Sequence, residues 1–340
     1  MTDDVAALSA SLAQLLTADG GGEPVPVRGL VQLSGGASKE SWTFEAHRGG
    51  QWQRLILRRD QPGAVPMSRA IEERPLLAAV RSAGVPVPLV LLGGIAEEWQ
   101  DASFLIMEHI EGETLARRIL RDQRYVAART VLLADAAAAL AGIHSIDTAA
   151  LDFMGDARST PRLLDDLEAL LDDSPDRHPA FEYGLRWLRR NQPPLVAPAV
   201  VHGDYRLGNL IVGEEGLRSV IDWELSYLGD PIRDLGYFCV RSWRFGNDAL
   251  PAGGLGSRRQ LCAAYEAAGG NRVDPDTLHY WEVYGNAVWG VQTGFLAKQF
   301  LDGLPSVELA AIGRRAVEME YDLLHLLNPA AVRARARAEA

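Results

Sequence analysis

The pattern of apolar residues changes near residue 110, and this change constrains the fold more than any other feature of the sequence. Before it, short apolar runs are separated by glycines and prolines; after it, apolar residues recur every three or four positions. The first pattern is typical of antiparallel strands and the second of amphipathic helices. We therefore expect a two-lobed α+β protein, with an antiparallel-sheet lobe at 1–110 and a mainly helical lobe at 111–340.

The expected elements follow from this periodicity. Apolar spacing predicts a helix over 5–16, and a second helical pattern ends at Gly84, where glycine and two prolines break it. Short β-type runs predict strands at 30–33, 41–46, 55–58, 89–92 and 104–107. Beyond residue 110, helical spacing predicts one long helix that carries Leu133, Ala137, Leu140 and His144 on one face. It also predicts further helices at 162–172, 177–190 and from 234 onward. The stretch 193–231 is rich in loops.

Charge and cysteine content exclude several classes of protein. With 34 basic and 45 acidic residues the net charge is −11, so the averaged surface field disfavours nucleic acid and anionic membranes as partners. The two cysteines, Cys239 and Cys262, cannot build a disulfide framework, and no Cys/His spacing suits zinc. The first residues are acidic where a signal peptide needs basic ones. We therefore expect a soluble, cytoplasmic protein.

The most informative stretch is VVHGDYRLGNLIV at 200–212, where β-type flanks enclose a polar loop. Asp204 and Asn209 lie in this loop, and a second strand-like run ends in Asp222. Phosphoryl transfer needs one carboxylate to orient an attacking hydroxyl, and amide and carboxylate oxygens to hold Mg²⁺ on nucleotide phosphates. The simpler alternative is a polar turn in which Asp and Asn only cap backbone groups.

Two neighbours of Asp204 have different expected roles. Arg206 carries a planar fork of donors that suits phosphate oxygens, so it could offset charge on a transferred phosphoryl group. His202 follows a strand directly, and we expect it to hydrogen-bond the loop backbone rather than to shuttle protons.

These residues resemble a known family. HGDYRLGN at 202–209, followed by IDWE at 221–224, resembles the HGDxxxxN signature and the metal-binding element of aminoglycoside phosphotransferases and choline kinases, relatives of protein kinases. Three other segments extend the resemblance over most of the chain: LSGGASKESW at 33–42, FLIMEHIEGETL at 104–115 and GDPIRDLGYF at 229–238. The sequences of these motifs are most similar to those of kinase-like domains associated with acyl-CoA dehydrogenases.

The resemblance implies a bilobal protein-kinase-like fold and roles for residues of the helical lobe. By position, Asp204 is the implied catalytic base, and Asn209 and Asp222 are the implied Mg²⁺ ligands. Asp234 is implied to be a structural acid that braces the catalytic region. Glu224 could assist a second metal or orient the acceptor.

A nucleotide site in the first lobe follows from the same chemistry. Gly35 and Gly36 lie between two predicted strands, where backbone N–H groups can approach phosphates, and Ser38 adds a donor. A hairpin turn without a ligand explains these glycines equally well. The third strand should carry a lysine that pairs with a helix glutamate, but Arg58 stands there, with Glu73 or Glu72 as its expected partner. A solvated surface ion pair is the alternative for Arg58.

The hinge and the acceptor site are less well defined. The resemblance implies that backbone groups of Glu108 and Ile110 meet the adenine edge, and that Met107 contacts its face. Trp281, Tyr284, Val288 and Phe295 share one helical face, which we interpret as core rather than as an acceptor pocket. The acidic segment 165–176 could attract a cationic acceptor, but a solvated helix face is the favoured interpretation.

Together these features predict a small-molecule kinase. It would transfer the γ-phosphoryl group of ATP or GTP, with Mg²⁺, to the hydroxyl of a small acceptor such as a hydroxyacyl thioester, in preference to an aminoglycoside. The alternative from another class is a nucleotide-binding pseudokinase scaffold that has lost transfer, and the arginine at position 58 is its best support.

Overall fold

The computed structural model describes residues 2–33, 39–61, 70–174, 176–303 and 307–330. The chain divides into two compact units: the first comprises Met1–Gly112 and Arg218–Leu225, and the second comprises Glu113–Leu217 and Ser226–Ala340. The short segment that carries Asp222 and Glu224 therefore belongs to the first unit, although it follows the polar loop of the second unit in the sequence.

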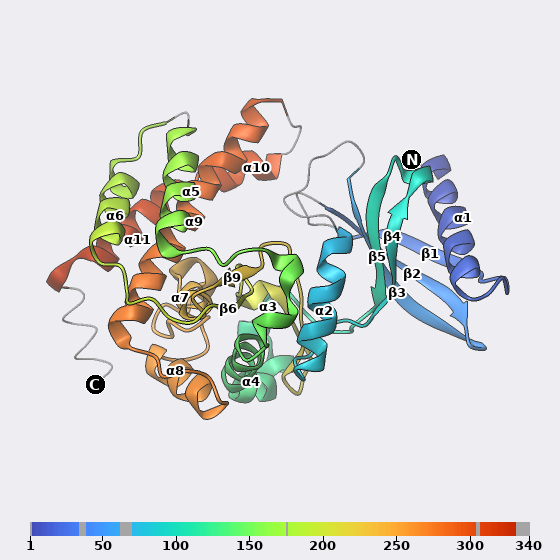
Figure 1. Ribbon diagram of the computed structural model, residues 1–340, viewed down its shortest axis with the longest axis horizontal. Coiled ribbons are helices and arrows are strands. Elements are labelled where there is room, and N and C mark those ends of the chain that lie inside the picture. Colours follow the sequence, from blue (N-terminus) through green and yellow to red (C-terminus); the bar gives the residue numbers. More distant parts are fainter. Residues whose placement is uncertain (1, 34–38, 62–69, 175, 304–306, 331–340) are drawn as a thin grey trace. The chain divides into compact units, whose positions relative to one another are not determined.

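The first unit is built on a five-stranded antiparallel sheet, with strand order β1-β2-β3-β5-β4 (Figure 1). Its strands are β1 (Val27–Gln32), β2 (Lys39–Arg48), β3 (Gln51–Asp60), β4 (Val90–Ala96) and β5 (Ala102–Glu108). All five strands predicted from the sequence are present, each longer than its periodic core. The prediction of an antiparallel-sheet lobe is confirmed.

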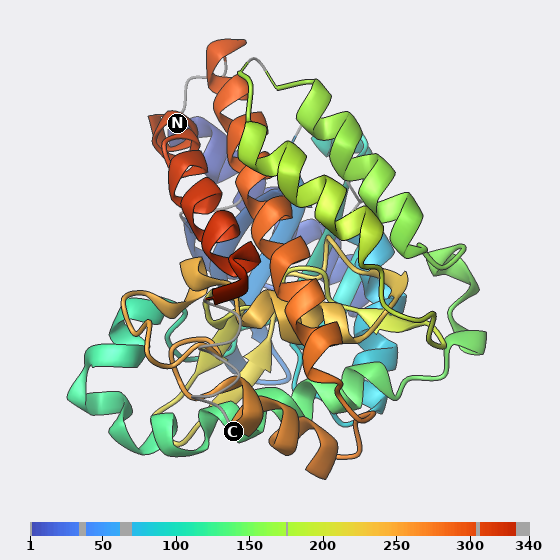
Figure 2. The same cartoon turned by 90° about the vertical axis from the view of Figure 1, so that its left-hand side faces the viewer.

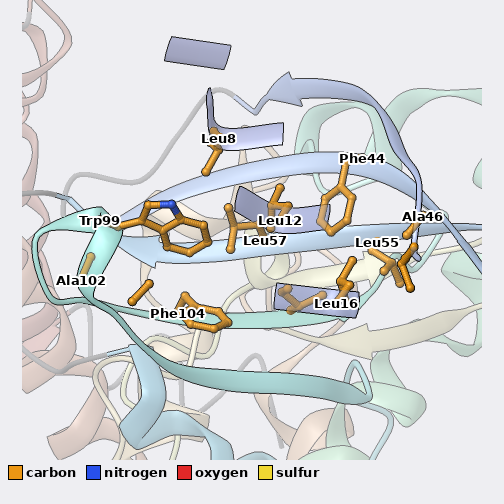
Figure 3. Close-up of a cluster of buried hydrophobic side chains, with 13 residues drawn as sticks. Leu8, Leu12, Leu16, Phe44, Ala46, Leu55, Leu57, Trp99, Ala102 and Phe104 are labelled. Atoms are coloured by element: carbon orange, nitrogen blue, oxygen red, sulfur yellow. The ribbon is translucent and has the colours of Figure 1, made fainter. Parts of the chain in front are cut away.

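Helix α1 (Thr2–Asp19) covers one face of this sheet. Leu8, Leu12 and Leu16 recur every four residues along one side of the helix, and all three are buried. They pack against strand residues that alternate along β2 and β3, including Phe44 and Leu57 (Figure 3). The hydrophobic core of the first unit therefore lies between α1 and the sheet.

The opposite face of the sheet carries polar residues and helix α2 (Glu73–Ser82). Because side chains alternate along a strand, Arg58 points away from the core to which Leu57 contributes. Asp60 accepts hydrogen bonds from the Ala70 backbone N–H (3.0 Å) and the Ser103 hydroxyl (2.7 Å). These bonds anchor the 3₁₀ turn η1 (Ala70–Glu72), which leads into α2.

The second unit is mainly helical, as the sequence predicts. Its α-helices are α3 (Ala116–Arg121), α4 (Val126–His144), α5 (Thr160–Asp172), α6 (Pro179–Arg190), α7 (Ile232–Phe238), α8 (Arg258–Ala267), α9 (Pro275–Leu301), α10 (Val307–Gly313) and α11 (Ala316–Leu327). Figure 2 shows the orange α9 running between the red α11 and the green α5 and α6. The bilobal protein-kinase-like fold expected from the sequence is confirmed.

The long helix α9 forms the centre of this unit. Trp281, Tyr284 and Val288 are buried, which confirms that this stripe is core, but Phe295 is 38% exposed and lies outside it. Gly236 of α7 allows the two helices to approach closely, because a Cβ there would lie 2.5 Å from the Trp281 backbone. The expectation of helices from 234 onward is correct only in part, since residues 240–257 form a 3₁₀ turn and loops.

Helix α4 supplies the other side of the core. Leu132, Ala136 and Leu140 are fully buried. Within the described residues, the segment Gln123–His144 is also the one stretch that is long and apolar enough to span a bilayer, and 44% of its most apolar window is buried inside the protein. The buried positions of this helix belong to the core of the second unit.

The loop-rich stretch 193–231 contains short strands. These are β6 (Ala199–Val201), β7 (Leu210–Val212), β8 (Leu217–Val220) and β9 (Tyr227–Gly229). In the second unit β6 pairs with β9, and Val212 bridges to Glu113. The pairing of β6 fixes the point at which the polar loop begins.

Candidate active site

The polar loop of the second unit is organised around the carboxylate of Asp204. Asn209 donates from its Nδ2 atom to the Asp204 backbone oxygen (2.9 Å) and to Oδ2 (2.7 Å). Arg206 shares its Nε–H between the two carboxylate oxygens, at 3.1 Å each. The carboxylate of Asp204 therefore has one fixed orientation.

Asp234 fixes the start of this loop through hydrogen bonds to its backbone. Its carboxylate accepts hydrogen bonds from the backbone N–H groups of His202 (2.7 Å) and Gly203 (3.0 Å). Gly203 has φ +89°, a left-handed conformation that turns its N–H toward Asp234 and that glycine adopts without strain. The bracing role implied for Asp234 is confirmed.

The charge on Asp234 is stabilised although the side chain is fully buried. Burial alone would raise the pKa of Asp234, but the hydrogen bond and charge of His144, with His202 and Arg233, outweigh it and hold the pKa below its usual range. Arg233 also donates to the Gly203 backbone oxygen (2.8 Å). Asp234 thus acts as an ionised support for the loop.

His202 has the structural role expected from the sequence. It is fully buried, and its Nδ1 atom accepts a hydrogen bond from the Asp204 backbone N–H (3.3 Å). Tyr237 also lies near Asp204. Burial is the main reason that the pKa of Tyr237 is raised, and the nearby Asp204 charge adds to it. Both residues position Asp204.

Arg206 is held between Asp204 and an aromatic ring. Its guanidinium carbon lies 4.9 Å from the centre of the Trp243 ring, a distance at which cation–π attraction is effective. Gly208 leaves room for this arrangement, because a Cβ there would lie 2.3 Å from Arg206 Nη1. In this structure Arg206 contacts the implied base; its contact with a phosphoryl group stays a prediction.

A second polar cluster, which we call the unit-1 charge cluster, consists of Lys39, Arg58, Glu73, Asp222 and Glu224. Arg58 Nη2 lies 2.8 Å from Asp222 Oδ1 and 3.4 Å from Glu224 Oε2, and Arg58 Nη1 lies 3.7 Å from Glu73 Oε2. Lys39 Nζ lies 3.2 Å from Glu73 Oε1 and 2.9 Å from Glu224 Oε2. Two cations are thus interleaved with three carboxylates.

The electrostatics follow from burial. Burial opposes the charge of Arg58, but Glu73, Asp222 and Glu224 outweigh it and raise the pKa of Arg58 above its ordinary value. Burial also raises the pKa of Glu73, against the opposing charges of Arg58 and Lys39. Of the two partners considered for Arg58 on helix α2, Glu73 is the one that contacts it. The alternative of a solvated surface pair is wrong, because only 4% of the Glu73 side chain is exposed.

Lys39 is a member of this cluster that the sequence analysis missed. It lies at the start of β2, paired with Asp60, and Ser41 pairs with Arg58, so all four side chains share one face of the sheet. Its charge is buried almost completely. Only the β2–β3 register shows that Lys39 lies near Glu73, since no local pattern distinguishes this lysine from a surface residue.

Asp222 has an unusual backbone. Its φ of +69° is uncommon for a residue other than glycine, and such conformations concentrate at functional sites. The Val220 backbone N–H donates to Pro86 (2.8 Å), which ties this segment to the first unit. The side chain remains one-third exposed, so its carboxylate is accessible to a ligand.

The residues implied to contact adenine, Met107, Glu108 and Ile110, lie at or just after the end of β5. Met107 is buried. The Glu108 backbone N–H donates to Leu89 (3.0 Å), so what Glu108 can offer a ligand is its carbonyl oxygen. Within the described ranges the Ile110 backbone N–H has no hydrogen bond, whereas that of His109 donates to Arg54. This alternation leaves an acceptor and a donor two residues apart, the pattern that the edge of a purine requires.

The predicted residues fall into two sets. Asp204, Arg206 and Asn209 are brought together in the second unit, and Arg58, Glu73, Asp222, Met107, Glu108 and Ile110 lie in the first. Gly35, Gly36 and Ser38 lie outside the described residues. That the two sets act on one ligand stays a prediction.

Each unit offers a side-chain oxygen of a kind that Mg²⁺ binds. Both Nδ2 hydrogens of Asn209 are used by Asp204, which leaves its Oδ1 atom as a free acceptor. Asp222 supplies a carboxylate, and oxygen ligands of these two kinds are those that Mg²⁺ prefers. In the part of the chain that the structure describes, no group of three His, Cys, Asp or Glu side chains could hold a metal ion.

Comparison with known proteins decides the family. Residues 29–270 match the family model described as "Phosphotransferase enzyme family". The chain belongs to this family. Among curated relatives, acyl-CoA dehydrogenase family member 10 of Mus musculus is 33% identical over 208 residues, which are 55% of this chain and 18% of that protein. Family member 11 of Gallus gallus is 32% identical over 233 residues, 63% of this chain and 28% of that one.

The chain also resembles solved structures along nearly its whole length. A Ralstonia eutropha JMP134 protein assigned to the aminoglycoside phosphotransferases matches with a TM-score of 0.69 and 24% identity, over 92% of this chain and 95% of that one. Aminoglycoside phosphotransferase APH(4)-Ia, in complex with ADP and hygromycin B, matches with a TM-score of 0.59 and 18% identity, over 92% and 98%. APH(2″)-IIIa with GDP and kanamycin matches with a TM-score of 0.64 and 15% identity, over 92% and 99%. These similarities to solved structures show the fold. The matched region spans less than a third of the length of each of these curated relatives.

Proposed function

We propose that this phosphotransferase is a small-molecule kinase that transfers the γ-phosphoryl group of ATP or GTP to a hydroxyl of its acceptor. The observation that carries the proposal is the Asp204 carboxylate, which Asn209 and Arg206 orient on a loop braced by buried Asp234. A polar turn that only capped backbone groups would not need such a support.

In the proposed reaction the acceptor hydroxyl donates its hydrogen bond to Asp204, which accepts the proton. The acceptor oxygen forms a bond to the γ-phosphorus as the bond between that phosphorus and the β,γ-bridging oxygen breaks, so ADP or GDP leaves. Arg206 offsets the negative charge of the γ-phosphoryl group. Positioning and electrostatics carry most of the rate in this reaction, because its transition state is loose. The rigid hydrogen-bond network around Asp204 supplies the positioning.

The unit-1 charge cluster would bind the nucleotide. Arg58 and Lys39 provide the positive charge for phosphate oxygens, and Glu73 holds both cations in place. Asn209 Oδ1 and Asp222 would hold Mg²⁺, which when bound neutralises phosphate charge. The Glu108 carbonyl and the Ile110 N–H would bind the purine edge, and Gly35, Gly36 and Ser38 would cover the phosphates.

The acceptor is proposed to be a hydroxyacyl thioester or a related catabolic hydroxyl compound. The curated relatives are acyl-CoA dehydrogenase family members by name, which supports an acceptor from acyl-thioester metabolism. Three of the acidic residues considered for a cationic drug are already paired, since Arg189 binds Asp165 and Glu168 and Arg162 binds Asp166. We also propose a cytoplasmic location.

Phosphate transfer from γ-labelled ATP or GTP, measured with Mg²⁺ and a panel of hydroxyl compounds, tests the proposal. Asp204→Asn should lower transfer about 10² to 10⁴-fold, the usual worth of a general base, while nucleotide binding stays intact. The matched control, Asp166→Asn on an exposed helix face, should leave transfer unchanged. Equal transfer by the Asp204 variant would reject the assigned role.

The alternative is a pseudokinase that binds nucleotide and transfers nothing. Arg58 no longer supports this alternative strongly, because Lys39 places a lysine beside Glu73 as well. A thermal shift with ATP or GTP, together with no labelled product from any acceptor, would favour the scaffold.

A further inference from the structure

A cavity of about 800 Å³ in the second unit is lined by an unusual number of arginines. Arg117 and Arg121 come from α3, Arg241 from the 3₁₀ turn at 241–244, and Arg315 from the residue before α11. Apolar side chains, among them Phe245, complete part of its wall. The protein as a whole has a net charge of −11, so such a basic concentration stands out.

The charge of this cavity is only partly compensated. Arg241 binds Asp248 (2.8 Å) and Asp322 (2.7 Å), and Arg315 lies 3.4 Å from Glu318. Four arginines against these three carboxylates leave the lining with an excess of one positive charge.

The excess lies on helix α3. Among the described residues no carboxylate forms an ion pair with Arg117 or Arg121, and Arg121 donates only to the backbone oxygen of Phe245 (3.2 Å). Arg118, between them, binds Glu113 (3.1 Å) and does not line the cavity. Two guanidinium groups on one side of α3 thus face the cavity without a counter-charge.

A short series of contacts connects the cavity to Asp204 within the second unit. Ser242 lines the cavity, and the next residue, Trp243, lies against the Arg206 guanidinium that holds Asp204. The Trp243 ring also contacts Trp289, with ring centres 5.0 Å apart. One residue of the cavity lining thus adjoins, in the sequence, the aromatic residue that contacts Arg206.

We propose that this cavity binds an anionic group of the acceptor, a phosphate or a carboxylate, while the acceptor hydroxyl reaches Asp204. The proposal rests on the proposed function and specifies its substrate class. A guanidinium fork binds either anion through paired hydrogen bonds. Because the averaged field of the chain repels anions, an anionic acceptor needs a local basic site of this kind. Val317 and Tyr321, on the same lining, suit the carbon chain between the two ends.

Four acceptors that differ in charge test the selectivity. 3-Hydroxybutyryl-coenzyme A carries phosphates, its N-acetylcysteamine thioester is neutral, free 3-hydroxybutyrate carries a carboxylate, and kanamycin is a cation. We expect kcat/KM for at least one of the two anionic acceptors to exceed that for the neutral thioester by about tenfold or more, the worth of one charge-assisted contact. Preference for the coenzyme A ester identifies phosphate, and preference for the free acid identifies carboxylate. Equal or better transfer to the neutral or cationic compound overturns the inference.

Variants of α3 connect this selectivity to the cavity. Arg117→Ala combined with Arg121→Ala should raise KM for the anionic acceptor about tenfold or more, with the neutral thioester unaffected. The paired lysine substitutions should restore part of the affinity, and Arg118→Ala, on the same helix but outside the cavity, should match the wild type. No change in the double alanine variant overturns the inference.

A binding measurement separates failure of the inference from failure of the proposed function. Calorimetric titration with coenzyme A, in the presence of a saturating non-hydrolysable ATP analogue that occupies the nucleotide site, and with citrate as a carboxylate probe, reports anion binding without transfer. Binding that the double alanine variant loses, with no transfer to any acceptor, supports the anion site and rejects the kinase. Transfer without measurable binding of either probe rejects the anion site and keeps the kinase.

Discussion

Replacement of Asp234 by asparagine should destabilise the second unit strongly. The carboxylate is fully buried, and its two oxygens accept N–H groups of His202 and Gly203 while Arg233 and His144 lie beside it. An asparagine amide can accept only one of the two N–H groups, so one buried donor loses its partner. Removing one member of a buried charged set costs about 3 to 5 kcal/mol.

Urea denaturation of the wild type, Asp234→Asn and the exposed-pair control Asp166→Asn measures this cost. The control should lose under about 1 kcal/mol of unfolding free energy. The pKa of Asp234 is lowered in the folded state. Its contribution to the free energy of unfolding is therefore fully present above about pH 4, the pKa of an aspartate in the unfolded chain, and is lost as the pH falls through the lower pKa of the folded state. The difference in unfolding free energy between the wild type and Asp234→Asn should therefore become smaller at acidic pH. A loss no larger than that of the control, or a difference that widens in acid, would refute the reasoning.

Three further perturbations test other parts of the account. Gly208→Ala would place a Cβ 2.3 Å from Arg206 Nη1, so the arginine must move. We expect kcat to fall while the Kd of the nucleotide stays constant. An unchanged kcat would contradict this expectation. Leu12→Ala removes a fully buried side chain from the core under α1 and should cost about 2 to 5 kcal/mol in urea denaturation, whereas the exposed Gln14→Ala should cost almost nothing. Arg58→Met should weaken ATP binding in equilibrium titration by about tenfold or more, and Arg58→Lys should weaken it less because the charge is kept; equal loss in both would argue against a charge effect.

Periodicity predicted most of the fold, because the first unit buries alternating residues and the helices of the second bury one face. The strands β1 to β5 and helices α1, α4, α5 and α6 follow directly from such patterns. The strands β6 to β9 have three or four residues each, too few to show a period. Helix α9 is buried on most sides over much of its length, so its stripe does not mark a binding face.

The candidate site was predictable where its residues are close in sequence. Asp204, Arg206 and Asn209 lie in one loop, and the structure joins them by hydrogen bonds that the sequence analysis did not predict. Lys39 and Glu224 were missed or left without a firm role, because their contact spans 185 positions and depends on the register of β2 and on the path of the chain after β8. Local patterns carry no information on such pairings.

The proposed function requires that Asn209 and Asp222, which belong to different units, hold one cation on one nucleotide. The most direct test is a crystal structure of the full chain with Mn²⁺ and a non-hydrolysable ATP analogue, with the metal located by its anomalous scattering. We expect the cation within about 2.0 to 2.3 Å of Asn209 Oδ1 and of an Asp222 carboxylate oxygen, with the γ-phosphate directed at Asp204. A nucleotide-bound cation that either side chain fails to contact would contradict the account.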